Sequence, residues 1–230
     1  MTPKRYKRII DVLNRRQAGL TVIADQIHKG RNLSAMLRTC DAVGVDQLHA
    51  VIPSEGYQIF NGTAASSQNW VEVKYHNSIA TPINEYKALG YQLVAASISS
   101  TAIPFRQVDY SVPTAIVFGA EVKGISDFVM ENVDLQIILP MVGMVESYNV
   151  SVACAMILSE VQRQRQEKRM YDSRQISDEL FLTRYYHWAH PEIAKYCDKH
   201  GISYPPLRED GEVENPAEWY RSVRQNNNNE

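Results

Sequence analysis

The sequence of 230 residues lacks the short motifs of several large enzyme classes. It has no GxGxxG fingerprint, no Walker A loop and no GxSxG elbow, which argues against dinucleotide enzymes, P-loop nucleotide hydrolases and α/β-hydrolases. Cys40, Cys154 and Cys197 are far apart, and the six histidines are scattered without metal-ligand spacing. We therefore expect no metal or dinucleotide site, and we expect each histidine at the surface or in packing.

The sequence also lacks an apolar run long enough to span a bilayer, and its N-terminus lacks the apolar stretch of a signal peptide. The apolar fraction of 44% and charged fraction of 22% are ordinary for a soluble globular protein with one sizeable core and appendages. The few, scattered cysteines indicate reduced core thiols. These features predict a cytoplasmic protein without membrane contact.

A large excess of charge of one sign is missing too, because the net charge is −2. The charges are nevertheless uneven: bases crowd the N-terminal segment and the end of the last core helix, whereas acids collect after residue 178. Two basic clusters suit a phosphate-binding surface, and solvated helix faces are the alternative interpretation. The predicted phosphate-binding residues are Lys4, Arg5, Lys7, Arg8, Arg15, Arg16, Arg163, Arg165 and Lys168.

Strand-like and helix-like segments alternate through the middle of the chain. Apolar runs predict strands at 21–27, 47–52, 71–75, 91–98, 114–118 and 135–139. Helical spacing, with caps such as Asn32, Ser126 and Asn149, predicts helices at 32–44, 79–89, 126–132 and 150–165. This alternation predicts an α/β domain with a mostly parallel sheet covered by helices on both faces.

The two ends of the chain read differently from the middle. Residues 4–17 predict an amphipathic helix with its basic side outward. The part from residue 167 onward predicts one or two helices that carry Tyr185, Tyr186, Trp188 and Trp219, and residues 225–230 are expected to be disordered. We therefore divide the chain into a basic N-terminal helix (1–19), a core (20–166) and a C-terminal helical extension (167–230).

Three stretches lie in order at predicted strand-to-helix junctions: NLSAMLRTCDAVG at 32–44, FGAEVKGIS at 118–126 and PMVGMVESYNVSVA at 140–153. Together they resemble the three signatures of the SpoU branch of RNA ribose 2′-O-methyltransferases. The resemblance covers about residues 20–166. It implies a C-terminal trefoil knot, which periodicity alone would never predict because knots are rare.

The resemblance also implies an activity and its participants. We expect methylation of a ribose 2′-hydroxyl by S-adenosyl-L-methionine, in transfer RNA (tRNA), at guanosine 18 of the D-loop, by a homodimer. The implied catalytic residues are Asn32, Arg38, Glu121, Ser147 and Asn149. The implied cofactor-binding residues are Ala96, Gly119, Leu139, Met141, Ser147 and Tyr148, the last in place of the usual leucine.

The role of Arg38 has two interpretations within this family. It is either the general base or a cation that binds RNA phosphate and stabilises the forming oxyanion, and a guanidinium that stays protonated favours the second. Without the resemblance, Arg38 would be read as a surface ion-pair residue beside Asp41. The alternatives for the whole chain are a ribosomal RNA methyltransferase, a catalytically silent RNA-binding protein of the same fold, and a doubly wound dinucleotide enzyme.

Overall fold

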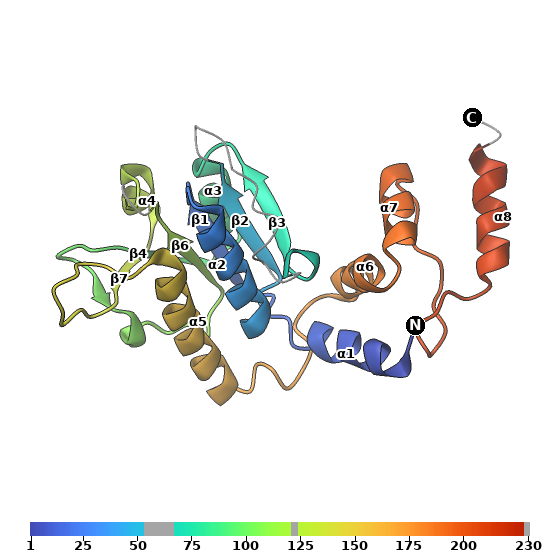
Figure 1. Ribbon diagram of the computed structural model, residues 1–230, viewed down its shortest axis with the longest axis horizontal. Coiled ribbons are helices and arrows are strands. Elements are labelled where there is room, and N and C mark those ends of the chain that lie inside the picture. Colours follow the sequence, from blue (N-terminus) through green and yellow to red (C-terminus); the bar gives the residue numbers. More distant parts are fainter. Residues whose placement is uncertain (53–66, 121–123, 228–230) are drawn as a thin grey trace. The chain divides into compact units, whose positions relative to one another are not determined.

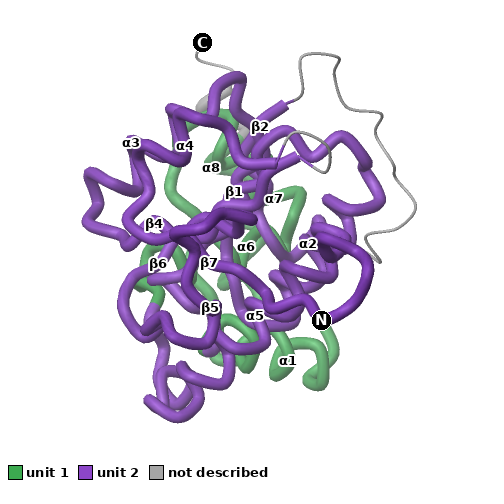
Figure 2. Tube along the Cα trace, turned by 90° about the vertical axis from the view of Figure 1, so that its left-hand side faces the viewer, with its two compact units in different colours: residues 1–14, 176–230 green, residues 15–175 purple. Residues whose placement is uncertain are grey.

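The computed structural model describes residues 1–52, 67–120 and 124–227, which form two compact units (Figures 1 and 2). The core unit comprises Arg15–Gln175. The helical unit combines Met1–Asn14 with Ile176–Glu230, so the N-terminal helix packs with the C-terminal part of the chain.

The core unit is built on a seven-stranded sheet in which every pair of neighbouring strands is parallel. The strand order is β3-β2-β1-β6-β4-β7-β5. The strands are β1 (Leu20–Asp25), β2 (Gln47–Val51), β3 (Glu72–His76), β4 (Gln92–Ala96), β5 (Ile103–Pro104), β6 (Thr114–Phe118) and β7 (Leu135–Ile138). The predicted parallel α/β sheet is confirmed, and β5 is an additional edge strand of two residues.

Alternate residues of the strands bury against helices on opposite faces of the sheet (Figure 1). On one face Val22 and its equivalents pack with α2 (Gly30–Val43) and α5 (Val150–Glu167). On the other face Ile23 and its equivalents pack with α3 (Ala80–Ala88) and α4 (Asp127–Asn132). Burial on both faces explains why β1 and β6 read as continuous apolar runs.

The predicted helix caps have different outcomes. Helix α2 begins at Gly30, so Asn32 lies in its first turn and is not the cap; the prediction of an Asn32 cap is wrong. Gly44 ends this helix in the left-handed conformation, with φ of 86°. The predicted cap Asn149 is confirmed, because its side chain accepts from the Ser151 amide at 2.9 Å.

The helical unit contains α1 (Pro3–Leu13), α6 (Asp178–Ala189), α7 (Pro191–His200) and α8 (Pro216–Asn227). Helix α1 packs on α6 with Ile9 and Leu13 buried. It ends before the predicted residue 17, and Gln17 instead donates its amide to the Gly44 carbonyl within the core unit. Helix α8 continues to Asn227, whereas disorder was expected from residue 225.

Two short 3₁₀ helices, η1 (Ser67–Asn69) and η2 (Phe105–Gln107), complete the regular structure of the core unit. All three cysteines are buried, as expected of core thiols. In the part of the chain that the structure describes, no helix has the length and apolar character needed to cross a membrane.

Candidate active site

A cavity of about 710 Å³ opens at the carboxyl ends of β4, β6 and β7, beside the start of α5. Parallel strands of an open α/β sheet bind ligands at this edge. The residues predicted for cofactor contact all line this one cavity: Ala96, Gly119, Leu139, Met141, Ser147 and Tyr148. Residues that are up to 52 positions apart in sequence are thus gathered around one space of ligand size.

The loop after β6 reaches the cavity through a close backbone contact. A Cβ atom at Gly119 would collide with the backbone of Gly124, so only glycine fits there. The Gly124 amide donates to the Ala120 carbonyl at 2.8 Å and closes the loop. The predicted catalytic residue Glu121 lies outside the described residues.

The base of this loop is joined to β1 by a buried carboxylate. The Ser126 hydroxyl donates to Asp25 Oδ2 at 3.3 Å, and Asp25 is 3% exposed. Burial raises the pKa of Asp25, and the Ser126 hydrogen bond partly offsets that rise. The carboxyl ends of β1 and β6 are therefore tied together beside the cavity.

The first and third signature stretches meet through two asparagines. Asn149 Nδ2 donates to Asn32 Oδ1 at 3.2 Å, which joins the beginning of α5 to the first turn of α2. Asn149 Oδ1 also accepts from the Ser151 hydroxyl at 2.6 Å. Asn32 is 8% exposed, whereas Asn149 is exposed and lines the cavity. Asn32 therefore fixes the orientation of an amide that faces the cavity.

Arg38 lies on the exposed side of α2, between buried Leu37 and Cys40 on either side of it in sequence. The ion-pair interpretation needs Asp41 as its partner. Asp41 instead accepts from Arg16 Nη2 at 2.8 Å. Within the described parts of the chain, Arg38 has no ion pair, so its charge is open to a ligand from solution.

Three charged residues of the cavity wall were missed by the sequence reasoning: Lys29, Asp127 and Glu146. Glu146 lies inside the third signature stretch, Asp127 directly follows the second, and Lys29 lies three residues before the first, so proximity to these stretches was the available signal. No group of His, Cys, Asp or Glu within the described residues is arranged to hold a metal ion.

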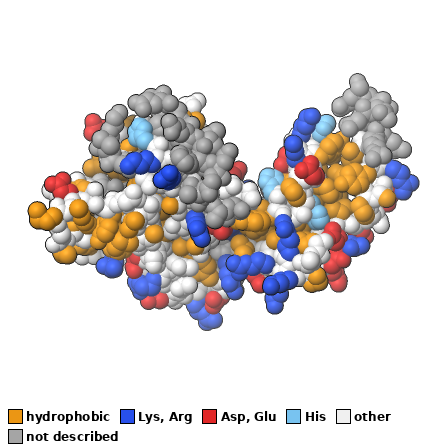
Figure 3. Space-filling model, viewed as in Figure 1, with side chains coloured by type: hydrophobic (Ala, Val, Ile, Leu, Met, Phe, Trp, Pro, Cys, Tyr) orange, Lys and Arg blue, Asp and Glu red, His pale blue; other side chains and the backbone are white. Residues whose placement is uncertain are grey.

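The residues predicted to bind phosphate fall into different environments. Lys4, Lys7, Arg8, Arg15 and Lys168 are exposed. Arg5 is exposed but donates to the Trp188 carbonyl at 3.2 Å. Arg163 is about half exposed and forms ion pairs with Glu160 and Glu167. Lys and Arg side chains gather over α1 in Figure 3.

Two of the predicted phosphate-binding residues are fully buried, and the prediction is wrong for them. Arg165 donates to the carbonyls of Tyr110, Gly19 and Val112 at 3.0, 2.7 and 3.2 Å. Arg16 donates to the carbonyls of Val45 and Trp70 at 3.0 and 2.8 Å. Guanidinium groups held in this way cannot reach a nucleic acid, so these two arginines are structural.

Comparison with protein families matches most of the chain. Residues 19–159 match the SpoU rRNA Methylase family, and residues 163–216 match the C-terminal region of SpoU rRNA methylases. The tRNA (guanosine(18)-2′-O)-methyltransferase of Escherichia coli (strain K12) is 41% identical over 226 residues, which cover 97% of this chain and 99% of that protein.

Two further relatives agree with these matches. The tRNA (guanosine(18)-2′-O)-methyltransferase of Thermus thermophilus is 46% identical over 78% of this chain and 93% of its own length. Among solved structures, the A. aeolicus TrmH/SpoU tRNA modifying enzyme has a TM-score of 0.77 and 41% identity, and it covers 83% of this chain and 97% of its own.

Proposed function

Because the chain belongs to the SpoU rRNA Methylase family, we propose that it transfers the methyl group of S-adenosyl-L-methionine to the ribose 2′-hydroxyl of guanosine 18 in tRNA. The observation that carries this proposal is the cavity that gathers the six expected cofactor-binding residues beside the Asn32–Asn149 hydrogen bond. Relatives that align with this chain over nearly their whole length carry this activity in their names, which favours tRNA over ribosomal RNA.

The cavity fits S-adenosyl-L-methionine in size and in character. Its volume of about 710 Å³ lies within the range of small-molecule sites. Phe118, Ile137 and Leu139 supply apolar wall, and the bare backbone at Gly119 allows close approach of a polar ligand. The bound cofactor would supply an electrophilic methyl group on its sulfonium sulfur.

In the proposed mechanism the protein aligns the ribose and stabilises charge. Asn149, held by Asn32, and Ser147 would orient the 2′-hydroxyl toward the methyl carbon. Arg38 would bind the adjacent phosphate and stabilise the negative charge that grows on the 2′-oxygen as its proton passes to solvent water. We favour this role for Arg38 over that of general base, because a guanidinium remains protonated in proteins.

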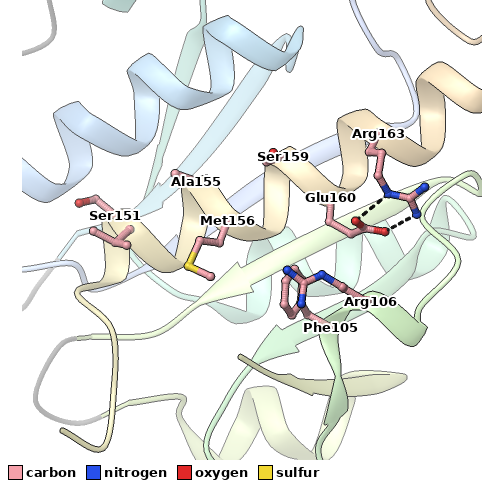
Figure 4. Close-up of a pocket in the computed structure, with 9 residues that line it drawn as sticks. Phe105, Arg106, Ser151, Ala155, Met156, Ser159, Glu160 and Arg163 are labelled. Atoms are coloured by element: carbon pink, nitrogen blue, oxygen red, sulfur yellow. Dashed lines mark hydrogen bonds and ion pairs between the residues drawn. The ribbon is translucent and has the colours of Figure 1, made fainter. Parts of the chain in front are cut away.

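We also propose a homodimer whose contact includes the outer side of α5. Ser151, Ala155 and Ser159 lie there with Val152, which is 46% exposed. Figure 4 shows this side beside Phe105 and Arg106, where a cavity of about 570 Å³ lies. Small residues permit close packing of a second helix. Sedimentation equilibrium should give about twice 26.2 kDa, and a fully active monomer would contradict the proposal.

The trefoil knot and the cytoplasmic location expected from the sequence belong to the same proposal. The sheet order supports the knot, because β7 is inserted between β4 and β5, two strands that are already connected earlier in the chain. An experimental structure that traces the chain from Ala120 to α5 tests it. Three buried free cysteines and a tRNA substrate favour the cytoplasm.

Methyl transfer from tritiated S-adenosyl-L-methionine tests the activity directly. Unmodified tRNA transcripts should accept one methyl group at guanosine 18, mapped by nuclease digestion. A transcript with a 2′-deoxyguanosine at that position should accept none, which is the matched control for the reacting hydroxyl. Incorporation only into ribosomal RNA, or RNA binding without incorporation, would support the alternatives.

A further inference from the structure

The connection Ser97–Ala102 passes from one side of β7 to the other. It leaves the carboxyl end of β4, which pairs with β7, and enters β5, which pairs with the opposite edge of β7. Its first two residues, Ser97 and Ile98, line the cavity of the candidate active site. Ile98 is 67% exposed although it is a large apolar side chain.

One side chain of β7 holds the middle of this connection. Gln136 Oε1 accepts hydrogen bonds from the hydroxyls of Ser99 at 2.6 Å and Thr101 at 3.2 Å. The Ser97 hydroxyl lies 3.5 Å from the same oxygen, at the outer limit of a hydrogen bond. One acceptor therefore collects three hydroxyl groups from five consecutive residues.

The connection is also ordered within itself. The Thr101 amide donates to Ser99 Oγ at 3.2 Å, and the two hydroxyl oxygens are 2.9 Å apart. One backbone bond attaches its start to the sheet, from the Ser97 amide to the Ile137 carbonyl at 3.0 Å, and a second, from the Ala102 amide to the Ser99 carbonyl at 3.2 Å, lies within the connection. Among the described residues, Gln136 is thus the side chain that attaches the middle of the connection to the sheet.

We propose that Gln136 is a positioning residue for the methyl donor, which holds the connection so that Ile98 covers the bound cofactor. The inference rests on the proposed function, since it takes the cavity as the S-adenosyl-L-methionine site. A preordered loop loses less conformational entropy when a ligand binds, and burial of Ile98 against the ligand adds apolar contact. Gln136 itself does not line the cavity, so it acts through Ser99 and Thr101.

Two substitutions at Gln136 separate its acceptor from its bulk. Gln136→Leu removes the acceptor and should raise the KM for S-adenosyl-L-methionine about tenfold, the scale of one or two lost hydrogen bonds. The KM for tRNA and the kcat should stay within about twofold. Gln136→Glu keeps an acceptor oxygen and should restore the KM to within about threefold of the wild type.

Two further variants guard against a general effect on the sheet. Gln47→Leu on β2 is the matched control, since Gln47 donates to Glu72 at 2.8 Å and does not line the cavity. It should leave the KM for the cofactor unchanged. Ile98→Ser leaves Gln136 intact and should raise that KM about as much as Gln136→Leu.

Calorimetric titration with S-adenosyl-L-methionine distinguishes a failure of the proposed function from a failure of the role proposed for Gln136. A wild type that fails to bind would overturn the proposed function together with this inference. A wild type that binds, alongside Gln136→Leu and Ile98→Ser with unchanged affinity, would overturn this inference alone. A KM that rises equally in Gln136→Leu and Gln136→Glu would also overturn it, because the acceptor would then be irrelevant.

Discussion

The buried and the exposed arginines of the core unit have opposite environments. At the amino ends, Arg165 binds carbonyls that precede β1 and β6, and Arg16 binds carbonyls that precede β2 and β3. Both are fully buried. Arg38, by contrast, is exposed on the second half of α2 and is not among the described residues that line the cavity.

The difference shows that burial decides whether an arginine charge serves the fold or stays available to a ligand. The buried arginines satisfy backbone carbonyls that would otherwise be costly to bury. The guanidinium of exposed Arg38 forms no ion pair with the described residues, so its charge is available to a substrate. A cluster of charges in the sequence can contain both buried and exposed arginines, because Arg15 is exposed and its neighbour Arg16 is buried.

Removal of Arg165 should have the largest effect on stability. Arg165→Leu leaves several buried carbonyls and the Gln17 side chain without their donor, so unfolding should become easier by about 3 to 5 kcal/mol. Guanidinium denaturation followed by circular dichroism measures it. The matched control is Arg169→Leu, four residues away, whose ion pair with Asp172 is exposed on both sides, so stability should change little. Equal effects of the two would break the comparison.

Removal of Arg38 should affect catalysis and spare stability. Arg38→Ala should lower kcat by roughly two to three powers of ten, the scale of a lost oxyanion donor. The Tm and the affinity for S-adenosyl-L-methionine should change little, because Arg38 supports no contact in the core. Arg38→Lys keeps the charge but loses the planar fork, and a large residual defect is expected if the phosphate contact is bidentate.

Near-normal turnover in both Arg38 variants would remove Arg38 from the active site. A large drop in Tm would instead place it with the buried arginines. Either outcome would contradict the contrast between the exposed and the buried arginines.

The sequence was sufficient for the sheet because burial on both faces makes the central strands β1 and β6 read as apolar runs. It was insufficient for β5, since two residues show no periodicity and Pro104 argues against a strand except at an edge. The start of α2 was placed two residues late because Asn32 resembles a cap. Its amide instead binds Asn149, from the third signature stretch.

Most of the cavity residues were predictable because four of the six lie in signature stretches and Leu139 directly precedes one; Ala96, at the end of β4, came from the family resemblance alone. The burial of each arginine was not predictable, because Arg15 is exposed beside buried Arg16, and Arg163 is exposed two residues before buried Arg165 on the same helix. Only the tertiary contacts show which guanidinium meets a carbonyl. Gln136 was missed for the same reason, since its hydroxyl partners belong to another strand's connection.

A pH titration extends the comparison to a third buried polar group, His49. Its ring nitrogens lie 2.8 Å from His76 Nε2 and 2.8 Å from the Tyr86 hydroxyl. Burial, followed by the charges of His76 and Lys74, lowers the pKa of His49 to about 4. As pH falls, the unfolded chain takes up this proton near pH 6.5, before the folded chain does. Stability is therefore complete above about pH 6.5 and is lost progressively down to about pH 4.

The expected loss is about 1 to 3 kcal/mol across this window. His49→Gln should flatten this part of the pH dependence of unfolding, while His28→Gln, at an exposed position, should not. An unchanged profile in His49→Gln would mean that the buried cluster does not control acid sensitivity.

The smallest effect is expected from the exposed bases of α1, which are exposed like Arg38 but belong to the helical unit. Replacement of Lys4, Lys7 and Arg8 by glutamine should weaken tRNA binding by about tenfold and flatten the plot of log affinity against log salt by about 2 to 3. With each phosphate contact that is lost, fewer counterions are released on binding, and this lowers both the affinity and its dependence on salt. Cofactor affinity should not change.

Replacement of Lys195 and Lys199 on α7 lowers the net charge of the same unit and serves as the control. If both sets flatten the slope equally for each charge removed, overall charge and not α1 attracts the RNA. An unchanged slope in the α1 variant would mean that the exposed bases of α1 do not contact the RNA.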